Sequence, residues 1–240
     1  MPLTITVRNK EVSTLKDWEN AFNDEKHWKE GRSAYSLADF ILNRNGLKII
    51  AEKLQQCGIG NIDFLSCDVE ASVKFDNYKR KSQRDMVLIG KLENNNKIFI
   101  TVEAKVDESF GCTIENSLKS QNTHRAKELL EKFIPHHSEQ DKKLRYQLFH
   151  AAAATIEKGD YGQNFQKSIM LVLVFKTTGF ENEVNYNEKK GENNYKEFCR
   201  FMQAIGADKK KENDVWTLNF QSKEIAFIYS QIEFKNLHIQ

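Results

Sequence analysis

An alternating segment at residues 97–106 constrains the fold of this chain more than any other part of the sequence. A period of two is typical of a β-strand, because successive side chains point to opposite faces of a sheet. One face of this strand would carry Phe99, Thr101, Glu103 and Lys105, and the other would carry Ile98, Ile100, Val102, Ala104 and Val106. An acid and a base therefore lie about 6.6–7 Å apart between Cα atoms on one face. Charged side chains seldom occupy so apolar a strand unless the site needs them.

A second short strand is predicted immediately upstream, at residues 85–90. It is an apolar run that begins with Asp85 and ends with a glycine. The Asn-rich connection at residues 91–96 is short, so the two strands should form an antiparallel hairpin. Pairing would place Asp85 opposite the end of the next strand, where it can meet Glu103 and Lys105.

These three side chains are suited to metal-dependent hydrolysis of a phosphodiester. Asp85 and Glu103 would bind a hard divalent cation, Mg²⁺ or Mn²⁺, with the backbone carbonyl of Ala104 as a further ligand. The cation would polarise the phosphate and lower the pKa of a bound water. Lys105 would orient that water or offset charge in the transition state.

At these residues the sequence resembles the PD-(D/E)XK nuclease superfamily. Asp85 matches the motif aspartate, Glu103 the second acid and Lys105 the lysine. The longer string at residues 103–111, EAKVDESFG, is similar to that of an uncharacterised bacterial family within the superfamily. The residue before Asp85 is Arg84 and not proline, which departs from the motif.

The resemblance implies an α/β fold with a restriction-endonuclease-like core. Such a core has a central mixed sheet flanked by helices, in the order helix, three antiparallel strands, helix, strand, and this chain would add N-terminal and C-terminal elements. The implied partner is a nucleic acid, with DNA favoured over RNA. A homodimer stays open, because double-strand cutters of this fold often pair two sites.

Hydrophobic periodicity supplies elements in that order. Residues 169–175 are continuously apolar, as expected of a strand that is buried on both faces. Helices are predicted from Leu15 to Phe22, from a cap at Ser33 to Leu54 with a break at residues 45–46, from a cap at Thr113 to Phe133, from a cap at Asp141 to Thr155, and from Tyr195 to Ile205; further strands are predicted at residues 62–75, 215–220 and 225–229.

Three further residues are candidates for the site, each with a plainer alternative. Gln147 falls on the buried side of the predicted helix that begins at Asp141, where it would orient a water or a phosphate or simply bond at the helix edge. Glu108 is a further candidate metal ligand, or part of a charged turn with Asp107. Arg32, near a helix start, would bind phosphate or form an ion pair.

A basic run precedes the metal-binding aspartate. Its cations are Lys79, Arg80, Lys81 and Arg84. Contacts to phosphates flanking the scissile bond would fix the register of a polyanionic substrate, so we predict that these residues bind nucleic acid. The alternative is a solvated turn.

Composition narrows the class of protein. With 240 residues, two prolines and neither a linker-like stretch nor a repeat, the chain should form a single domain over residues 1–240. The longest apolar run, residues 169–175, is far shorter than the ~20 residues that span a bilayer, and we see no signal peptide. Scattered cysteines without a C-x-x-C pair favour free thiols. We therefore expect a cytoplasmic protein without a membrane partner.

Two alternatives to a nuclease stay open at this stage. Glu103 and Lys105 would form only a solvated stripe if the sheet were half exposed, worth under about 1 kcal/mol. The fold would otherwise serve as an inactive module that binds nucleic acid or a protein. A small-molecule enzyme is disfavoured, because the sequence has no Gly-rich phosphate loop and no G-x-S-x-G elbow.

Superfamily members often draw another acid from the first core helix, and Glu30, Asp39 and Glu52 are the candidates here.

Overall fold

A computed structural model describes residues 3–22, 24–79, 81–121, 123–162, 164–180, 185–210, 213–221 and 223–236. No helix within these ranges is long and apolar enough to cross a membrane. The helices are α1 (Leu15–Phe22), α2 (Ser33–Asn43), α3 (Gly46–Gln56), α4 (Ile114–Leu118), α5 (Thr123–Phe133), α6 (Tyr146–Glu157) and α7 (Glu188–Ala204), with 3₁₀ turns η1 (Asp141–Lys143) and η2 (Gly159–Tyr161). The strands are β1 (Ile5–Val7), β2 (Lys10–Glu11), β3 (Ile62–Val73), β4 (Ser82–Leu92), β5 (Lys97–Lys105), β6 (Lys167–Thr178), β7 (Asp208–Lys210), β8 (Val215–Phe220) and β9 (Lys223–Lys235).

The described strands form one mixed sheet in the order β2-β1-β3-β4-β5-β6-β9-β8-β7. Strands β3, β4 and β5 are antiparallel neighbours, as the predicted hairpin requires. Strand β6 lies parallel to β5, and β9 lies parallel to β6. The predicted α/β class with a large mixed sheet is therefore confirmed, and β5 lies at the centre of the sheet.

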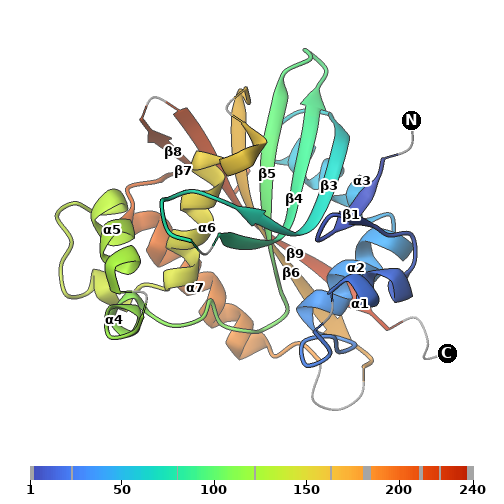
Figure 1. The fold of residues 1–240 in the computed structure, drawn as a ribbon, viewed down its shortest axis with the longest axis horizontal. Helices are drawn as coiled ribbons and strands as arrows, with labels where there is room; N and C mark the ends of the chain where they lie inside the picture. The colour runs from blue at the N-terminus through green and yellow to red at the C-terminus, as the bar shows by residue number, and fades with distance from the viewer. Residues whose placement is uncertain are drawn as a thin grey trace.

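Helices cover both faces of the sheet (Figure 1). Helices α1, α2 and α3 bury residues such as Leu37 and Ile50 against one face, and α5, α6 and α7 bury residues such as Phe149 and Phe198 against the other. Strand β6 contributes to both cores, with Ile169, Leu171, Leu173 and Phe175 on one side and Met170, Val172 and Val174 on the other. The prediction of a strand buried on both faces is confirmed.

The alternation predicted for residues 97–106 is also confirmed. Ile98, Ile100, Val102, Ala104 and Val106 join the core beneath the N-terminal helices. Phe99 packs on the opposite side with Ala154 of α6. The face that carries Glu103 and Lys105 is therefore the face that α6 covers.

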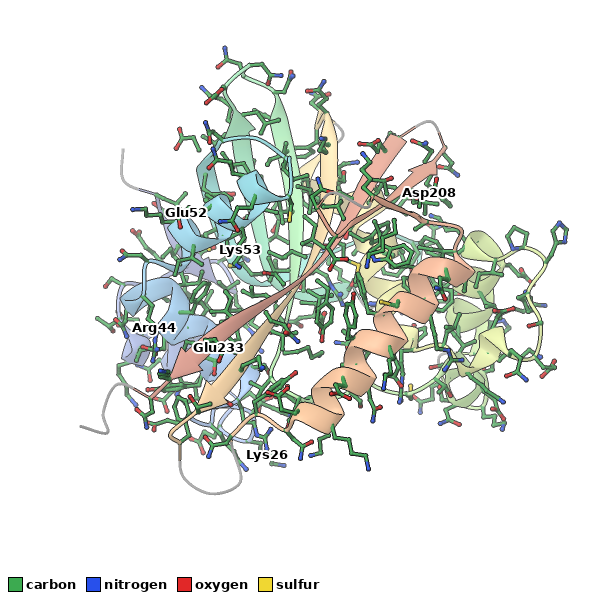
Figure 2. All side chains as sticks on the ribbon, turned by 180° about the vertical axis from the view of Figure 1, so that it is seen from behind. Lys26, Arg44, Glu52, Lys53, Asp208 and Glu233 are labelled. Carbon is green, nitrogen blue, oxygen red and sulfur yellow. The ribbon has the colours of Figure 1, made fainter. Side chains whose placement is uncertain are left out.

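A long crossover joins the parallel strands β5 and β6. It contains α4, α5, η1 and α6, and it returns the chain to the sheet beside β5. Figure 2 shows the molecule from behind, with α7 and the crossover helices on one side and the N-terminal helices on the other; α6 and α7 pack into the same core. This arrangement brings the start of α6 to the carboxyl end of β5.

Helix starts differ from the predictions at three positions, one of which is α7, since it begins at Glu188 and not at Tyr195. Ser33 is the first residue of α2 and Arg32 occupies the cap position, without a side-chain cap bond. The helix predicted to begin at Asp141 begins at Tyr146, because residues 144–146 pair with the segment before α4. Ile114 N donates to Leu144 O at 2.9 Å, and Tyr146 N donates to Cys112 O at 3.0 Å.

The helix predicted to run from a cap at Thr113 to Phe133 is two helices, α4 and α5. The cap is confirmed, because Thr113 Oγ1 accepts a hydrogen bond from Asn116 N. Hydroxyl groups end α4, since Ser120 Oγ donates to Ser117 O and Thr123 Oγ1 donates to Leu118 O. Such local side-chain bonds compete with helical hydrogen bonds. Strands β1, β2 and β7, each three residues or fewer, were not predicted.

Candidate functional site

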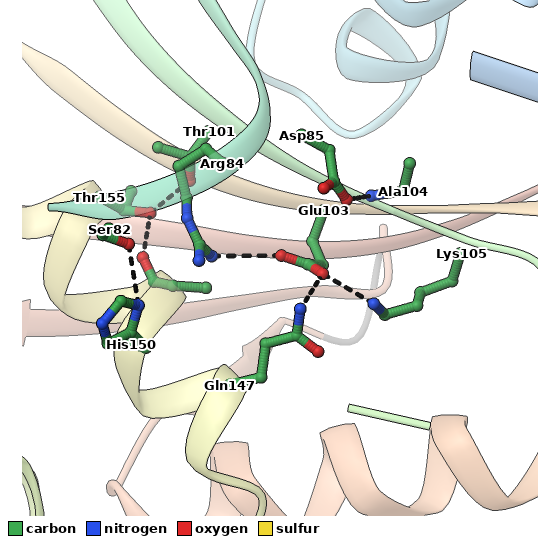
Figure 3. A network of polar contacts seen from close by, with 11 residues as sticks. Ser82, Arg84, Asp85, Thr101, Glu103, Ala104, Lys105, Gln147, His150 and Thr155 are labelled. Carbon is green, nitrogen blue, oxygen red and sulfur yellow. Dashed lines mark hydrogen bonds and ion pairs between the residues drawn. The ribbon is translucent and has the colours of Figure 1, made fainter. Parts of the chain in front are cut away.

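Strands β4 and β5 separate at the point where the predicted acids lie. Their paired residues run from Lys91 and Lys97 to Met86 and Val102, and the ladder stops there. Beyond it, Ala104 N donates to the side chain of Asp85, at 2.7 Å from Oδ2 (Figure 3). The Asp85 carboxylate thus supplies an acceptor for the free N–H group of Ala104 where the strands part.

Glu103 lies at the centre of a buried polar network. Its Oε1 accepts hydrogen bonds from Lys105 Nζ at 2.8 Å and from Gln147 Nε2, and its Oε2 lies 3.2 Å from Arg84 Nη1 (Figure 3). Glu103 is 2% exposed and Lys105 is 8% exposed. The solvated stripe considered above is therefore wrong. Charges buried to this degree need partners, and each oxygen of Glu103 has at least one.

The pKa of Asp85 is strongly perturbed. Burial is the main cause, the negative charge of Glu103 adds to it, and together they raise the pKa of Asp85 to about 8. The charge of Lys105 and the hydrogen bond from Ala104 N oppose that rise. Burial alone would lower the pKa of Lys105, but Glu103 and Asp85 outweigh it and the pKa is raised. Lys105 therefore keeps its charge at neutral pH.

Gln147 reaches the site from the first turn of α6, one residue after the helix begins. The sequence left two roles open for its amide, to orient a water or a phosphate or to form a hydrogen bond at the helix edge. In the structure the amide donates to Glu103. Gln147 therefore belongs to the site, with Glu103 as its partner.

The basic run divides into different environments. Arg84 is 3% exposed and pairs with Glu103, so it lies inside the site and not on a surface loop. Lys79 and Lys81 are exposed. Arg80 lies outside the described residues.

Glu108 and Arg32 make structural contacts. Glu108 Oε2 accepts from Val106 N at 2.7 Å, and Glu108 Oε1 accepts from Ser33 N at 3.4 Å. Arg32 Nη1 lies 2.8 Å from Asp107 Oδ1. These contacts fasten the end of β5 to the start of α2, which agrees with the plainer alternatives of a charged turn and an ion-paired arginine.

None of the three acids considered in the N-terminal helices reaches the site. Asp39 pairs with Arg44 at 2.7 Å. Glu30 lines a separate surface pocket beside Tyr35. Glu52 is 54% exposed on α3, where Figure 2 labels it beside Lys53.

The acid that joins the site comes instead from β3, and sequence reasoning missed it. Glu70 lies next to Asp85 along a cavity of about 340 Å³ that Gln83 and Ala104 also line. Burial raises the pKa of Glu70, and its charge contributes to the raised pKa of Asp85. Gln83 Nε2 donates to Glu70 Oε2 at 2.7 Å. The available signal was an acid between the apolar residues Val69 and Ala71, the same pattern that identified Glu103.

The donor set is made of carboxylates. Among the described residues, no three His, Cys, Asp or Glu side chains come together as a ready metal-binding group. The oxygen atoms proposed as ligands are those of Asp85 and Glu103, with the carbonyl of Ala104 directly after Glu103 in sequence, and the Glu70 carboxylate lies along the cavity that Asp85 lines. Oxygen donors of this kind suit hard divalent cations better than zinc or copper.

Comparisons with known proteins place the chain in a family. No curated protein and no solved structure matches it. One family model, described as a domain of unknown function (DUF6946), matches residues 11–234. That range includes Asp85, Glu103, Lys105 and Gln147. The chain therefore belongs to the DUF6946 family.

Proposed function

We propose that this protein is a metal-dependent nuclease that hydrolyses phosphodiester bonds of a nucleic acid, with DNA favoured over RNA. One observation carries the proposal. Asp85, Glu103 and Lys105 gather where β4 and β5 separate, and the Asp85 end of this group lines a cavity. Two acids and a charged lysine beside an opening are the groups that this chemistry requires.

The order of the helices and strands supports the same proposal. Helix α3 precedes the antiparallel strands β3, β4 and β5, and α6 then leads into β6, which is parallel to β5. This order agrees with the restriction-endonuclease-like core implied by the sequence motif. The remaining strands extend the sheet beyond β3 on one side and beyond β6 on the other. The motif residues lie at the carboxyl end of β5, beside its neighbour β4.

The residues fit a divalent cation. Asp85 Oδ2 bonds to Ala104 N, whereas Oδ1 makes no hydrogen bond with the described residues. Asp85 and Glu103, with the Ala104 carbonyl, would hold Mg²⁺ or Mn²⁺. A bound cation supplies Lewis acidity toward the phosphate and lowers the pKa of water. Burial and the charge of Glu103 raise the pKa of Asp85, and a cation bound beside the carboxylate would lower it again.

Lys105 and Gln147 would have separate tasks. Lys105 remains protonated and presents its ammonium beside Glu103, where it offsets negative charge that develops on the phosphate. Gln147 donates to the same carboxylate oxygen, which fixes the orientation of Glu103. Arg84 holds the other oxygen. The protein thus orients Glu103 from three sides.

The same contacts favour a second candidate, a module of this fold that binds nucleic acid without cleaving it. Both oxygens of Glu103 already accept hydrogen bonds from Arg84, Lys105 and Gln147. In an inactive module these bonds would replace a metal permanently. Metal binding and turnover separate the two candidates.

Calorimetric titration with Mn²⁺ is the decisive measurement. The wild type should bind Mn²⁺, and Asp85→Asn should lose that binding, because an amide is a poor ligand for a hard cation. Asp68→Asn is the matched control, since Asp68 lies on β3 and bonds to Thr6 at 2.7 Å. Equal Mn²⁺ affinity in wild type and Asp85→Asn would contradict the metal site.

A cleavage screen then tests turnover. Single-stranded and double-stranded DNA and RNA are incubated with wild type and Asp85→Asn in Mg²⁺, in Mn²⁺ and in EDTA. We expect cleavage by the wild type that requires metal. Metal binding without cleavage of any polymer would favour the inactive module.

A further inference from the structure

A second cavity adjoins the proposed active site on the side of Arg84. Its volume is about 520 Å³, and it is lined by Lys81, Gln83, Arg84, Arg125, Tyr146 and His150, together with Ser72. Three of these residues are cationic, and none of the described residues that line the cavity is acidic. The first cavity, in contrast, contains Asp85 and Glu70. The first cavity is also lined by Asp24 and by the cation Arg8, so it mixes acids with a base, whereas the charged residues that line the second cavity are all cations.

Two hydrogen-bond donors at this second cavity have no acceptor within the described part of the chain. Arg84 Nε and Tyr146 Oη are both shielded from solvent and have no hydrogen-bond partner among the residues that the structure describes. A buried donor without an acceptor bears its full desolvation cost, so such atoms are rare in folded proteins. Burial also raises the pKa of Tyr146, which keeps its hydroxyl protonated as a donor. Both atoms could donate a hydrogen bond to a ligand that carries acceptor atoms.

The arginines are held so that they can serve an anion. Arg125 is buried and uses Nε and Nη2 to bond to Asp76, at 2.6 and 3.1 Å. Its guanidinium also lies over the ring of Phe75, 4.6 Å from the centroid. Arg84 uses Nη1 to bond to Glu103. Fixed guanidinium groups lose little side-chain entropy when they bind a phosphate.

We propose that this second cavity binds a phosphate group of a nucleic-acid strand, next to the scissile bond. The proposal rests on the nuclease function proposed above, because Arg84 links the cavity directly to Glu103. It adds Arg125, Tyr146 and His150 to the substrate-binding residues. Phosphate has several acceptor oxygens and a negative charge, which match two unpaired donors and a cationic lining.

The sharpest test is Tyr146→Phe, because it removes only the unpaired hydroxyl. Binding of a fluorescent single-stranded DNA oligonucleotide is measured by anisotropy in EDTA, where metal and cleavage play no part. We expect Tyr146→Phe to bind on the order of tenfold more weakly, as expected for one lost hydrogen bond to a charged group. Its melting temperature should be unchanged or higher, since a buried unsatisfied group is removed.

Tyr229→Phe is the matched control. Its hydroxyl is also buried and has no partner in the described ranges, but Tyr229 lies on β9 beside Tyr195 and Phe198 and does not line this cavity. Tyr229→Phe should bind the oligonucleotide like the wild type. Equal binding by Tyr146→Phe and wild type, or equal weakening by both variants, would overturn the proposal.

Lys81→Ala gives an independent measurement. For oligonucleotide binding, the slope of log K (the association constant) against log salt concentration should become less steep by roughly 0.7–0.9, which corresponds to one lost phosphate contact. Lys91→Ala, at the other end of β4, should leave the slope unchanged. An unchanged slope in Lys81→Ala would remove that lysine from the strand-binding surface and contradict its part in the site.

Inorganic phosphate distinguishes a strand from a free anion. Phosphate should displace the oligonucleotide only at concentrations far above the Kd of the oligonucleotide, because a strand makes contacts with the protein beyond this one phosphate. Phosphate that binds as tightly as the strand would overturn the assignment to nucleic acid. These experiments contain no metal, so they test the phosphate site separately from the metal site. Normal oligonucleotide binding together with failed Mn²⁺ binding would contradict the nuclease proposal but would still support a phosphate site in the second cavity.

Discussion

Lys105 Nζ lies 2.8 Å from Glu103 Oε1, and both side chains are almost completely buried. Charged residues that are neighbours on one face of a strand are usually expected to be exposed to solvent. Here α6 covers them, and Arg84 and Gln147 complete the set of partners. The pair therefore couples the stability of the domain to the chemistry proposed for it.

Removal of the central carboxylate should destabilise the protein strongly. Glu103→Gln leaves Lys105 and Arg84 buried without their counter-charge, which typically costs about 3–5 kcal/mol. Urea unfolding at neutral pH measures the loss. Glu52→Gln, at an exposed site, should stay within about 0.5 kcal/mol of wild type. A similarly small effect for Glu103→Gln would mean that the buried network contributes little.

Stability should fall with rising pH because of Asp85. Its pKa is raised to about 8, above the ordinary value of 3.8, so the folded state binds more protons than the unfolded state between these values. The free energy of unfolding therefore decreases through this window, by up to about 1.36 kcal/mol per pH unit from this group. Denaturation in EDTA across pH 4–9 should show a shallower decrease in Asp85→Asn than in wild type, because the raised pKa of Glu70 remains in the variant. Parallel curves for the two proteins would contradict the raised pKa.

Glu70 should influence the titration of Asp85. Because its negative charge contributes to the raised pKa of Asp85, Glu70→Gln should lower that pKa. Carbon-13 NMR of the Asp85 carboxyl group across the same pH range measures the change. Asp68→Asn, two residues earlier on β3, serves as the comparison, and an equal shift in both variants would argue against a specific effect of Glu70.

Turnover should depend on Lys105. If cleavage is found, Lys105→Ala should slow it by about 10²–10³, as expected when a preorganised charge stabiliser is removed. Lys97→Ala, exposed at the other end of β5, should cleave at the wild-type rate. Cleavage at an undiminished rate by Lys105→Ala would remove the lysine from the mechanism.

Hydrophobic patterns over short stretches of sequence were sufficient to predict the strands at the centre of the sheet. The alternation at residues 97–106 predicted β5 and its two faces, and the apolar run at residues 169–175 predicted β6. Pairing across the hairpin then predicted that Asp85 and Glu103 would meet. These features depend on neighbours in sequence or on one turn, which periodicity describes well.

Other features depend on distant contacts that periodicity does not contain. The start of α6 is set by pairing with residues 112–114, so the cap predicted at Asp141 was wrong. Arg84 belongs to a basic run in the sequence but is buried by its ion pair with Glu103. Glu70 joins the site through the pairing of β3 with β4. In each case a partner far along the chain decides the environment.

The parallel pairing of β5 with β6 has a consequence for a chain that is still being synthesised. Strand β5 cannot gain its second neighbour until residues 106–166 have been made, which takes roughly 3–12 s at about 5–20 residues per second. During that interval β5 is the open edge of a growing sheet. Charged side chains on an open edge hinder pairing with strands of other molecules. Glu103 and Lys105, buried in the finished domain, would therefore place two charges on that edge for as long as it stays open.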